Sequence, residues 1–336
     1  MALPNRGVPL VRTDCVHDLA ELFSERDINV YSLITGVKAP VDIQRCEFPF
    51  IPETVLLNII RMFGESVSLD TFVTRVWLMC KNTYIPGVIA QLVKAREGTV
   101  KEALEEFCEI IRYYSSGVKI SLKLHNDCYW LVREKEGATQ DWFKYAEIFS
   151  FIFLDELIRA LTKHNSKEKY VTIVSPHTEC FFECSQLAYV QFFTLRSVTG
   201  IRLNNEILSQ KVNLIKNSGR EVIDQEGIPS DFLCSFKHAM QPYLSMGKLP
   251  ISTAANILGM SPRTIQRRLF GASVTYREVL DDLILNEVQV RLKYSDDSIT
   301  SIATNIGYGE SANFTRFFKR KTGFTPSQFR SQHQGL

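Results

Sequence analysis

The sequence lacks any long apolar run. No stretch of its 336 residues approaches the ~18 consecutive apolar residues that a membrane-spanning helix needs. Its first residues, MALPNRGVPLVRTDC, hold no apolar core of the length that a secretory signal requires. We therefore expect a cytoplasmic protein without a membrane partner.

Enzyme signatures are absent too. The chain has no Gly-rich phosphate loop, no GxSxG elbow and, among its six histidines, no HExxH pair. From these absences we expect no catalytic residues, no metal and no cofactor. The chain is accordingly predicted not to be an enzyme.

The eight cysteines are scattered, and many have apolar neighbours. The densest group is His177, Cys180 and Cys184, an H-x2-C-x3-C pattern that lacks the second cysteine pair of a structural zinc site. We interpret the cysteines as reduced, buried thiols. A metal or redox site at this pattern is the alternative.

Length and charge indicate two different parts. A chain of this length suits about two domains. Its net charge is only +2, but residues 228–336 contain 13 Lys and Arg against 8 Asp and Glu, whereas the rest contains 26 against 29. This difference favours a basic nucleic-acid-binding part joined to a neutral or acidic part.

The first 208 residues mix two hydrophobic periods. Helical spacing is clearest over residues 99–113, where Thr99 and Glu102 have the spacing of a capping box. Alternation over residues 118–132 predicts a β-hairpin that turns at Asn126-Asp127. Further helices are expected at 11–23, 52–63, 69–80 and 141–162, and further strands at 170–174 and 189–194. We predict an α+β domain over 1–208, followed by a linker rich in turn formers over 209–229.

An all-α domain is predicted over residues 230–336. In ISTAANILGMSPRTIQRRLF, residues 251–270, a helix of small residues ends at Gly259 and a second helix begins with Ser261 as its N-cap. Ile265 and Leu269, four residues apart, are expected to face inward. The pattern is typical of a helix-turn-helix unit.

A second pair of the same kind lies at about 298–322. Its first helix ends at Gly307, and its second places three phenylalanines on one side and basic residues on most of the rest. The uninteresting alternative for one such pair is a helical hairpin with a solvated basic face, but two copies favour DNA binding. Residues 275–294 contain neither Pro nor Gly and predict a long connecting helix, with one face formed by Val279, Leu283, Asn286 and Val290.

Together these motifs closely resemble the DNA-binding domain of AraC/XylS-type bacterial transcription regulators. The resemblance covers roughly the last third of the chain, and Asn305 departs from it, since the family more often has an apolar or small residue there. It rests on LGMSPRTIQRRL, on Leu292…Ile299…Ala303…Ile306-Gly307-Tyr308, on Phe314…Phe318-Lys319, and on Gly323…Thr325-Pro326…Phe329-Arg330.

The first part resembles, less specifically, the arabinose-binding-like effector domain of the same family. The matching features are Gly98-Thr99 leading into Ala103-Leu104, the alternating hairpin, and residues 189–193. The name does not imply that arabinose is the ligand. The sequence identifies neither the effector nor the residues that contact it.

The resemblance implies a transcription regulator that binds double-stranded promoter DNA, with activation as the expected sign. Its expected partners are RNA polymerase, a small-molecule effector on the first domain, and a second copy in a homodimer. Two alternatives stay open: a DNA-repair type enzyme with a helix-turn-helix appendage, and a constitutive dimeric DNA-binding protein without a ligand.

Outward positions on the second helix of each pair are the candidate DNA contacts. In the first pair, Arg has the donors to pair with guanine and Gln can pair with adenine in the major groove. The candidates are Arg263, Gln266 and Arg267 in the first pair and, by resemblance, Ser311, Ala312, Thr315 and Arg316 in the second. Arg268, Lys319 and Arg320 are expected to contact phosphates, which fix register without reading sequence.

Overall fold

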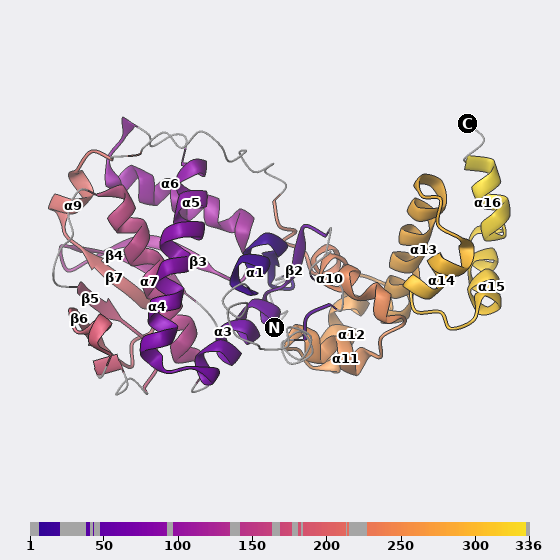
Figure 1. The fold of residues 1–336 in the computed structure, drawn as a ribbon, viewed down its shortest axis with the longest axis horizontal. Coiled ribbons are helices and arrows are strands. Elements are labelled where there is room, and N and C mark those ends of the chain that lie inside the picture. The colour runs from indigo at the N-terminus through magenta and orange to yellow at the C-terminus, as the bar shows by residue number, and fades with distance from the viewer. Residues whose placement is uncertain are drawn as a thin grey trace. The chain divides into compact units, whose positions relative to one another are not determined.

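The computed structural model describes residues 7–20, 38–40, 43, 48–92, 97–134, 142–162, 169–176, 181–182, 184–212, 214 and 227–333. Its contacts divide the chain into two compact units (Figure 1). The C-terminal unit comprises Met1–Leu10, Lys38–Thr54 and Pro229–Leu336, and the N-terminal unit comprises Val11–Val37 and Val55–Ile228. Most of the expected linker, residues 213 and 215–226, lies outside the described residues. The bounds 1–208, 209–229 and 230–336 therefore stay a prediction.

The C-terminal unit contains the expected helices. One pair is α11 (Ile251–Leu258) and α12 (Pro262–Gly271), and the other is α14 (Ile299–Asn305) and α15 (Ser311–Thr322). α13 (Tyr276–Tyr294) connects the pairs, and α16 (Pro326–His333) follows them. α10 (Phe232–Met240) precedes them and continues as a 3-10 helix over Gln241–Met246. Pro242 has no N–H for α-helical bonding, which accounts for this change.

Side-chain caps begin these helices, and one of them is Ser261, which the sequence predicts. Ser261 Oγ accepts the N–H of Thr264 at the start of α12, and Ser298 Oγ accepts the N–H of Ser301 at the start of α14. Thr275 and Glu278 form a complete capping box on α13. Such caps satisfy backbone donors that have no partner within the helix.

The buried face of α13 differs from the predicted one. Val290 is 54% exposed, and Asn286 is exposed as well. The buried positions are instead Val279, Leu280, Asp281, Leu283, Ile284, Val288 and Leu292. Helices on both sides of α13 pack on it, so its buried residues do not follow one narrow stripe.

Segments from the start of the chain belong to the C-terminal unit. The N–H of Val8 donates to Ser235 Oγ at 2.7 Å, and Tyr243 Oη donates to the carbonyl of Lys38 at 2.8 Å. Thr54 Oγ1 donates to the carbonyl of Ile257 at 2.5 Å. Strand β2 (Phe50–Pro52), which pairs with β1 (Leu10–Arg12), places the Phe50 ring 5.9 Å from the ring of His238. Sequence patterns alone did not indicate these contacts.

The N-terminal unit contains a five-stranded sheet with the order β3-β4-β7-β5-β6. β3 (Lys119–His125) and β4 (Cys128–Glu134) form the predicted hairpin, with positive φ at Asn126 and Asp127. β5 (Lys169–Thr172) and β6 (Val190–Phe193) are the other predicted strands, and they pair in parallel. β7 (Thr199–Leu203), which pairs antiparallel with β4 and β5, has no counterpart among the predicted elements.

Helices of the N-terminal unit pack on this sheet and on one another. α6 (Val100–Tyr114) has the predicted Thr99–Glu102 capping box, and α7 (Phe143–Leu161) contacts β7. The others are α1 (Thr13–Ala20), α3 (Glu53–Ser66), α4 (Leu69–Met79), a π-helical turn over Cys80–Tyr84, α5 (Ile85–Gln91) and α9 (Asn205–Ser209). Among the residues that the structure describes, no helix has the length and apolar character to cross a membrane.

Candidate nucleic-acid interface and cavity

The first helix pair turns tightly. Gly259 ends α11 in the left-handed conformation with φ 63°, which a residue with a Cβ adopts at a cost. Ile265 and Leu269 on α12 are fully buried, as the sequence predicts. Their burial fixes the rotation of α12, so its opposite face is presented to solvent.

Three of the four named residues on α12 lie on that exposed face. Arg263, Gln266 and Arg267 are exposed. Arg268 is half-buried, and its guanidinium carbon lies 5.1 Å from the ring centroid of Phe232 on α10. This cation–π contact gives Arg268 a packing role, and its phosphate contact stays a prediction.

The second pair is built around aromatic residues. Phe314, Phe317 and Phe318 of α15 are buried, as predicted. The Tyr308 ring, in the turn before α15, lies 5.7 Å from the ring of Phe314 and 5.8 Å from that of Phe317. These contacts hold α15 with its other side toward solvent.

Five of the six named residues of α15 are exposed, namely Ser311, Ala312, Arg316, Lys319 and Arg320, and Thr315 is half-buried. Arg316 Nη2 donates to Asn313 Oδ1 at 2.5 Å, and Asn313 Nδ2 donates to Glu310 Oε2 at 3.1 Å. Asn313 thus orients the guanidinium and is itself exposed. Sequence reasoning omitted it, although its position three residues before Arg316 is a recognisable signal.

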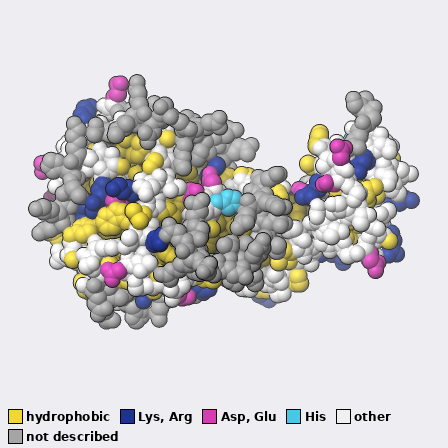
Figure 2. Space-filling model, viewed as in Figure 1, with side chains coloured by type: hydrophobic (Ala, Val, Ile, Leu, Met, Phe, Trp, Pro, Cys, Tyr) yellow, Lys and Arg dark blue, Asp and Glu magenta, His cyan; other side chains and the backbone are white. Residues whose placement is uncertain are grey.

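Positive charge is concentrated on these two helices. Neither α12 nor α15 contains Asp or Glu. α12 carries three arginines, and α15 carries Arg316, Lys319, Arg320 and Lys321. Figure 2 shows Lys and Arg side chains over the part of the C-terminal unit where α15 lies. An exposed surface of this kind attracts phosphate groups.

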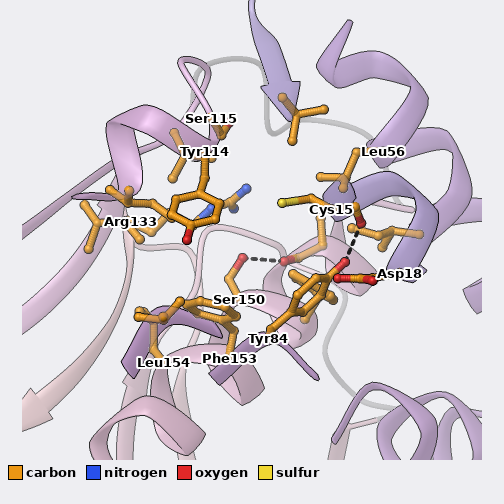
Figure 3. A pocket seen from close by; sticks show the side chains of 18 of the residues that line it. Cys15, Asp18, Leu56, Tyr84, Tyr114, Ser115, Arg133, Ser150, Phe153 and Leu154 are labelled. Carbon is orange, nitrogen blue, oxygen red and sulfur yellow. Dashed lines mark hydrogen bonds between the residues drawn. The ribbon is translucent and has the colours of Figure 1, made fainter. Parts of the chain in front are cut away.

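A cavity of about 420 Å³ lies within the N-terminal unit. Side chains from α1, α3, α5, α6 and α7 and from both strands of the β3–β4 hairpin line it (Figure 3). Its walls are mainly apolar, with Leu56, Phe153 and Leu154 among them. The size falls in the range of pockets that hold small molecules, about 300–1,000 Å³.

A few polar groups reach the cavity. Arg133, from β4, lines it although only 8% of the residue is exposed. Tyr84 Oη donates to the carbonyl of Cys15 at 2.5 Å, and Ser150 Oγ donates to the carbonyl of Ala146 at 2.6 Å (Figure 3). Asp14 and Asp18, one turn apart on α1, add negative charge.

Burial affects the ionisation of two side chains that line the cavity, Cys15 and Tyr84. It raises the pKa of the Cys15 thiol well above its ordinary value, and the neighbouring Asp14 carboxylate raises it further. Burial likewise raises the pKa of Tyr84. Both groups therefore stay protonated at neutral pH, whereas the thiolate is the reactive form of cysteine.

The cavity was not apparent from the sequence. Its lining comes from elements that are far apart along the chain, and its apolar members have the spacing of ordinary core residues. His177 and Cys180 of the H-x2-C-x3-C pattern lie outside the described residues. Within the described part of the chain, no group of three or more His, Cys, Asp or Glu side chains is placed to hold a metal ion.

Residues 254–332 match a protein family described as a helix-turn-helix domain. This part of the chain, with its exposed basic helices, is an AraC-type helix-turn-helix domain, as its motifs predicted. The match covers only the C-terminal part of the protein.

Among curated proteins, the chain is similar to the urease operon transcriptional activator of Escherichia coli, with 35% identity over 85 residues, 25% of this chain and 29% of that protein. It is also similar to the transcriptional activator RhaS of Enterobacter sp. (strain 638), with 32% identity over 79 residues, 23% of this chain and 28% of that protein. The chain thus spans less than a third of the length of these relatives. Among solved structures, the transcriptional regulator CdpR from Pseudomonas aeruginosa aligns over 91% of this chain and 98% of its own, with 17% identity and a TM-score of 0.37.

Proposed function

We propose that the chain is a sequence-specific transcription regulator that reads promoter DNA with both helix pairs, acting as two helix-turn-helix units. One observation carries the proposal: α12 and α15 each bury one apolar face and expose a basic face that is free of carboxylates. Both similar proteins, the urease operon activator and RhaS, are named as transcriptional activators, which supports regulation and favours activation.

Each candidate contact residue receives a role from its chemistry. Arg263, Arg267 and Arg316 have guanidinium donors suited to guanine, and Gln266 is suited to adenine. Ser311, Ala312 and Thr315 line the same helix face as Arg316, where small side chains admit the edge of a base. Lys319 and Arg320 would contact phosphates.

The first test is selection of bound sequences from random duplex DNA with the full-length chain. We expect a two-part site with its halves about one helical turn, ~34 Å, apart. In binding assays on that site, Arg267→Ala and Arg316→Ala should each weaken affinity by roughly 1–3 kcal/mol. Arg196→Ala, an exposed arginine of the N-terminal unit, is the control and should bind like the wild type. Failure to enrich any sequence would refute the proposal.

We propose further that the cavity holds a small, mainly apolar effector. Its volume and apolar walls support this, and Arg133, a buried charged residue in the lining, suits a ligand with a polar group. A cavity also favours this reading over a constitutive DNA-binding protein without a ligand. The repair-enzyme alternative gains no support from Cys184, since burial raises the pKa of its thiol.

Filling the cavity tests the effector proposal. Leu57→Trp would occupy part of the space that Leu57 lines, whereas Met62→Trp alters a half-buried residue of the same helix that does not line it. In a thermal-shift screen of small apolar molecules, a true effector should stabilise the wild type and Met62→Trp but not Leu57→Trp. Equal stabilisation of all three proteins would place the ligand elsewhere.

The connectivity of the chain suggests how effector binding in the cavity would influence the DNA-binding unit. Cavity-lining helices α1 and α3 each follow directly on a strand, β1 and β2. Thr54, the last residue before the chain enters the N-terminal unit, bonds the carbonyl of Ile257 on α11. An effector changes DNA affinity only if it binds two states of the chain unequally. Thr54→Val should preserve effector binding but reduce its influence on DNA affinity.

RNA polymerase and a second copy of the chain are the further partners of this proposal.

A further inference from the structure

Two glycine backbones are in direct contact within the C-terminal unit. Gly247 precedes α11 and has φ 80°, and Gly307 lies in the turn between α14 and α15 and has φ 77°. A Cβ on Gly307 would clash with the Cα and N atoms of Gly247, and one on Gly247 would lie 3.2 Å from the carbonyl oxygen of Gly307. The turn of the second helix pair therefore packs against the loop that leads into the first.

A buried carboxylate joins the same two regions. Asp281, on the connecting helix α13, has a side chain that is 8% exposed. Its Oδ1 lies 2.6 Å from Lys248 Nζ, in the loop before α11, and its Oδ2 lies 3.5 Å from Lys321 Nζ, at the end of α15. Lys248 Nζ also lies 4.6 Å from the ring centroid of Phe317 on α15. One side chain of α13 thus connects the loop before the first helix pair with α15 of the second pair.

The Asp281 carboxylate stays charged at neutral pH, so its ion pairs with Lys248 and Lys321 persist there. Burial acts to raise the pKa of Asp281, but the hydrogen bond and charge of Lys248, followed by Lys321, outweigh it, so the pKa is lowered. The carboxylate is therefore ionised. Tyr308, whose phenolic pKa is raised to about 12 by burial and by Asp281, is neutral.

The connecting helix alone leaves freedom between the two pairs. Residues 272–275 separate it from α12 and residues 295–298 separate it from α14, and helix α13 ends before reaching either stretch. Contacts that bypass these stretches remove that freedom. Two contacts do so: the Gly247–Gly307 backbone contact and the Lys248–Asp281–Lys321 ion-pair group. We call these two contacts together the clamp.

We propose that the clamp sets the separation and orientation of α12 and α15, and thereby the spacing between the two halves of the DNA site. Asp281 is its positioning residue: it touches no DNA and acts through the two lysines. The inference rests on the proposed DNA-reading function. It also assigns Lys321, unlike its neighbours Lys319 and Arg320, to the clamp rather than to the DNA backbone.

The test measures how affinity depends on the spacer of the selected site. Full-length proteins are titrated against the site and against versions with the spacer lengthened or shortened by one base pair, which moves the halves apart or together by about 3.4 Å. The readout is the ratio of affinities between spacers, so a uniform loss of binding cancels. For the wild type we expect the altered spacers to bind about tenfold more weakly, comparable to a mismatched base pair.

Two variants weaken the clamp. Asp281→Asn keeps the shape of the side chain and removes its charge, and Lys321→Met removes the more distant of the two lysine partners, at 3.5 Å from Asp281. Both should reduce the penalty for an altered spacer to about threefold or less. Glu287→Gln is the control, because it removes a carboxylate of the same helix whose partner, Arg291, lies four residues along α13 at 2.7 Å. Its spacer ratio should match the wild type.

The outcomes separate the clamp from the proposed function. If Asp281→Asn and Lys321→Met discriminate between spacers as strongly as the wild type does, the clamp does not set the spacing, and DNA reading by α12 and α15 stands. If the wild type binds a two-part site with no dependence on spacer length, the clamp is likewise refuted. If the wild type selects no sequence at all, the proposed function fails and the inference falls with it.

Discussion

Replacing Gly307 with alanine should destabilise the C-terminal unit more than any other glycine substitution near the helix pairs. Two costs add up. At φ 77° an added Cβ costs roughly 1–2 kcal/mol by local sterics, and its clash with the Gly247 backbone forces a shift that costs typically about 1–3 kcal/mol. Together, Gly307→Ala should lower the free energy of unfolding by about 2–5 kcal/mol.

Two other glycines separate these costs. Gly323 has φ 82° but no atom within 4 Å of an added Cβ, so Gly323→Ala pays only the local cost. Gly309 lies in the same turn as Gly307, but its φ is not positive and an added Cβ would have no atom within 4 Å. Gly309→Ala should therefore be close to neutral. The expected order of destabilisation is Gly307, then Gly323, then Gly309.

The assay must report on the C-terminal unit alone. All three tryptophans, Trp77, Trp130 and Trp142, lie in the N-terminal unit, so tryptophan fluorescence would follow the wrong part of the chain. Amide hydrogen exchange of peptides from α14 and α15 gives the local opening free energy instead. If Gly307→Ala opens no more readily than Gly323→Ala, the backbone contact with Gly247 contributes nothing and the reasoning behind the clamp is wrong.

Three further predictions concern the same unit. Phe318→Ala removes a fully buried ring and should cost about 3–5 kcal/mol, whereas Phe270→Ala, whose ring is 82% exposed, should stay within about 0.5 kcal/mol in the same exchange assay. Lys319→Gln should reduce the slope of log DNA affinity against log salt concentration by about 1. Lys321→Gln should change this slope less, because Lys321 pairs with Asp281. Equal changes would contradict the assignment of Lys321 to the clamp. The stabilising effect of Asp281 should be complete above its ordinary pKa of 3.8 and should disappear as pH falls through its lowered folded value. The difference in local opening free energy between wild type and Asp281→Asn, measured by amide hydrogen exchange of peptides from α13, should therefore shrink in acid. A difference that grows in acid would contradict this sign.

Local signals determined much of the C-terminal unit. Caps such as Ser261, the turn glycines Gly259 and Gly307, and the apolar positions of α12 and α15 act within a few residues, so their spacing along the chain predicts both the helices and the faces they expose. The candidate contacts Arg263, Gln266 and Arg267 follow from the exposed face of α12, whereas those predicted on α15 came from the family resemblance. The same is true of the β3–β4 hairpin and of the α6 capping box in the N-terminal unit.

Only the tertiary structure decided the rest, because it depends on residues brought together from distant parts of the chain. The cavity combines Cys15, Tyr84, Arg133 and Ser150, and nothing in the spacing of these residues distinguishes them from core positions. Strand β7 is short, contains Gly200, and is defined by pairing with two other strands rather than by its own pattern. The roles of Arg268, Asp281 and Lys321 depend on which neighbours they meet across helix packings, and sequence periodicity carries no information about those neighbours.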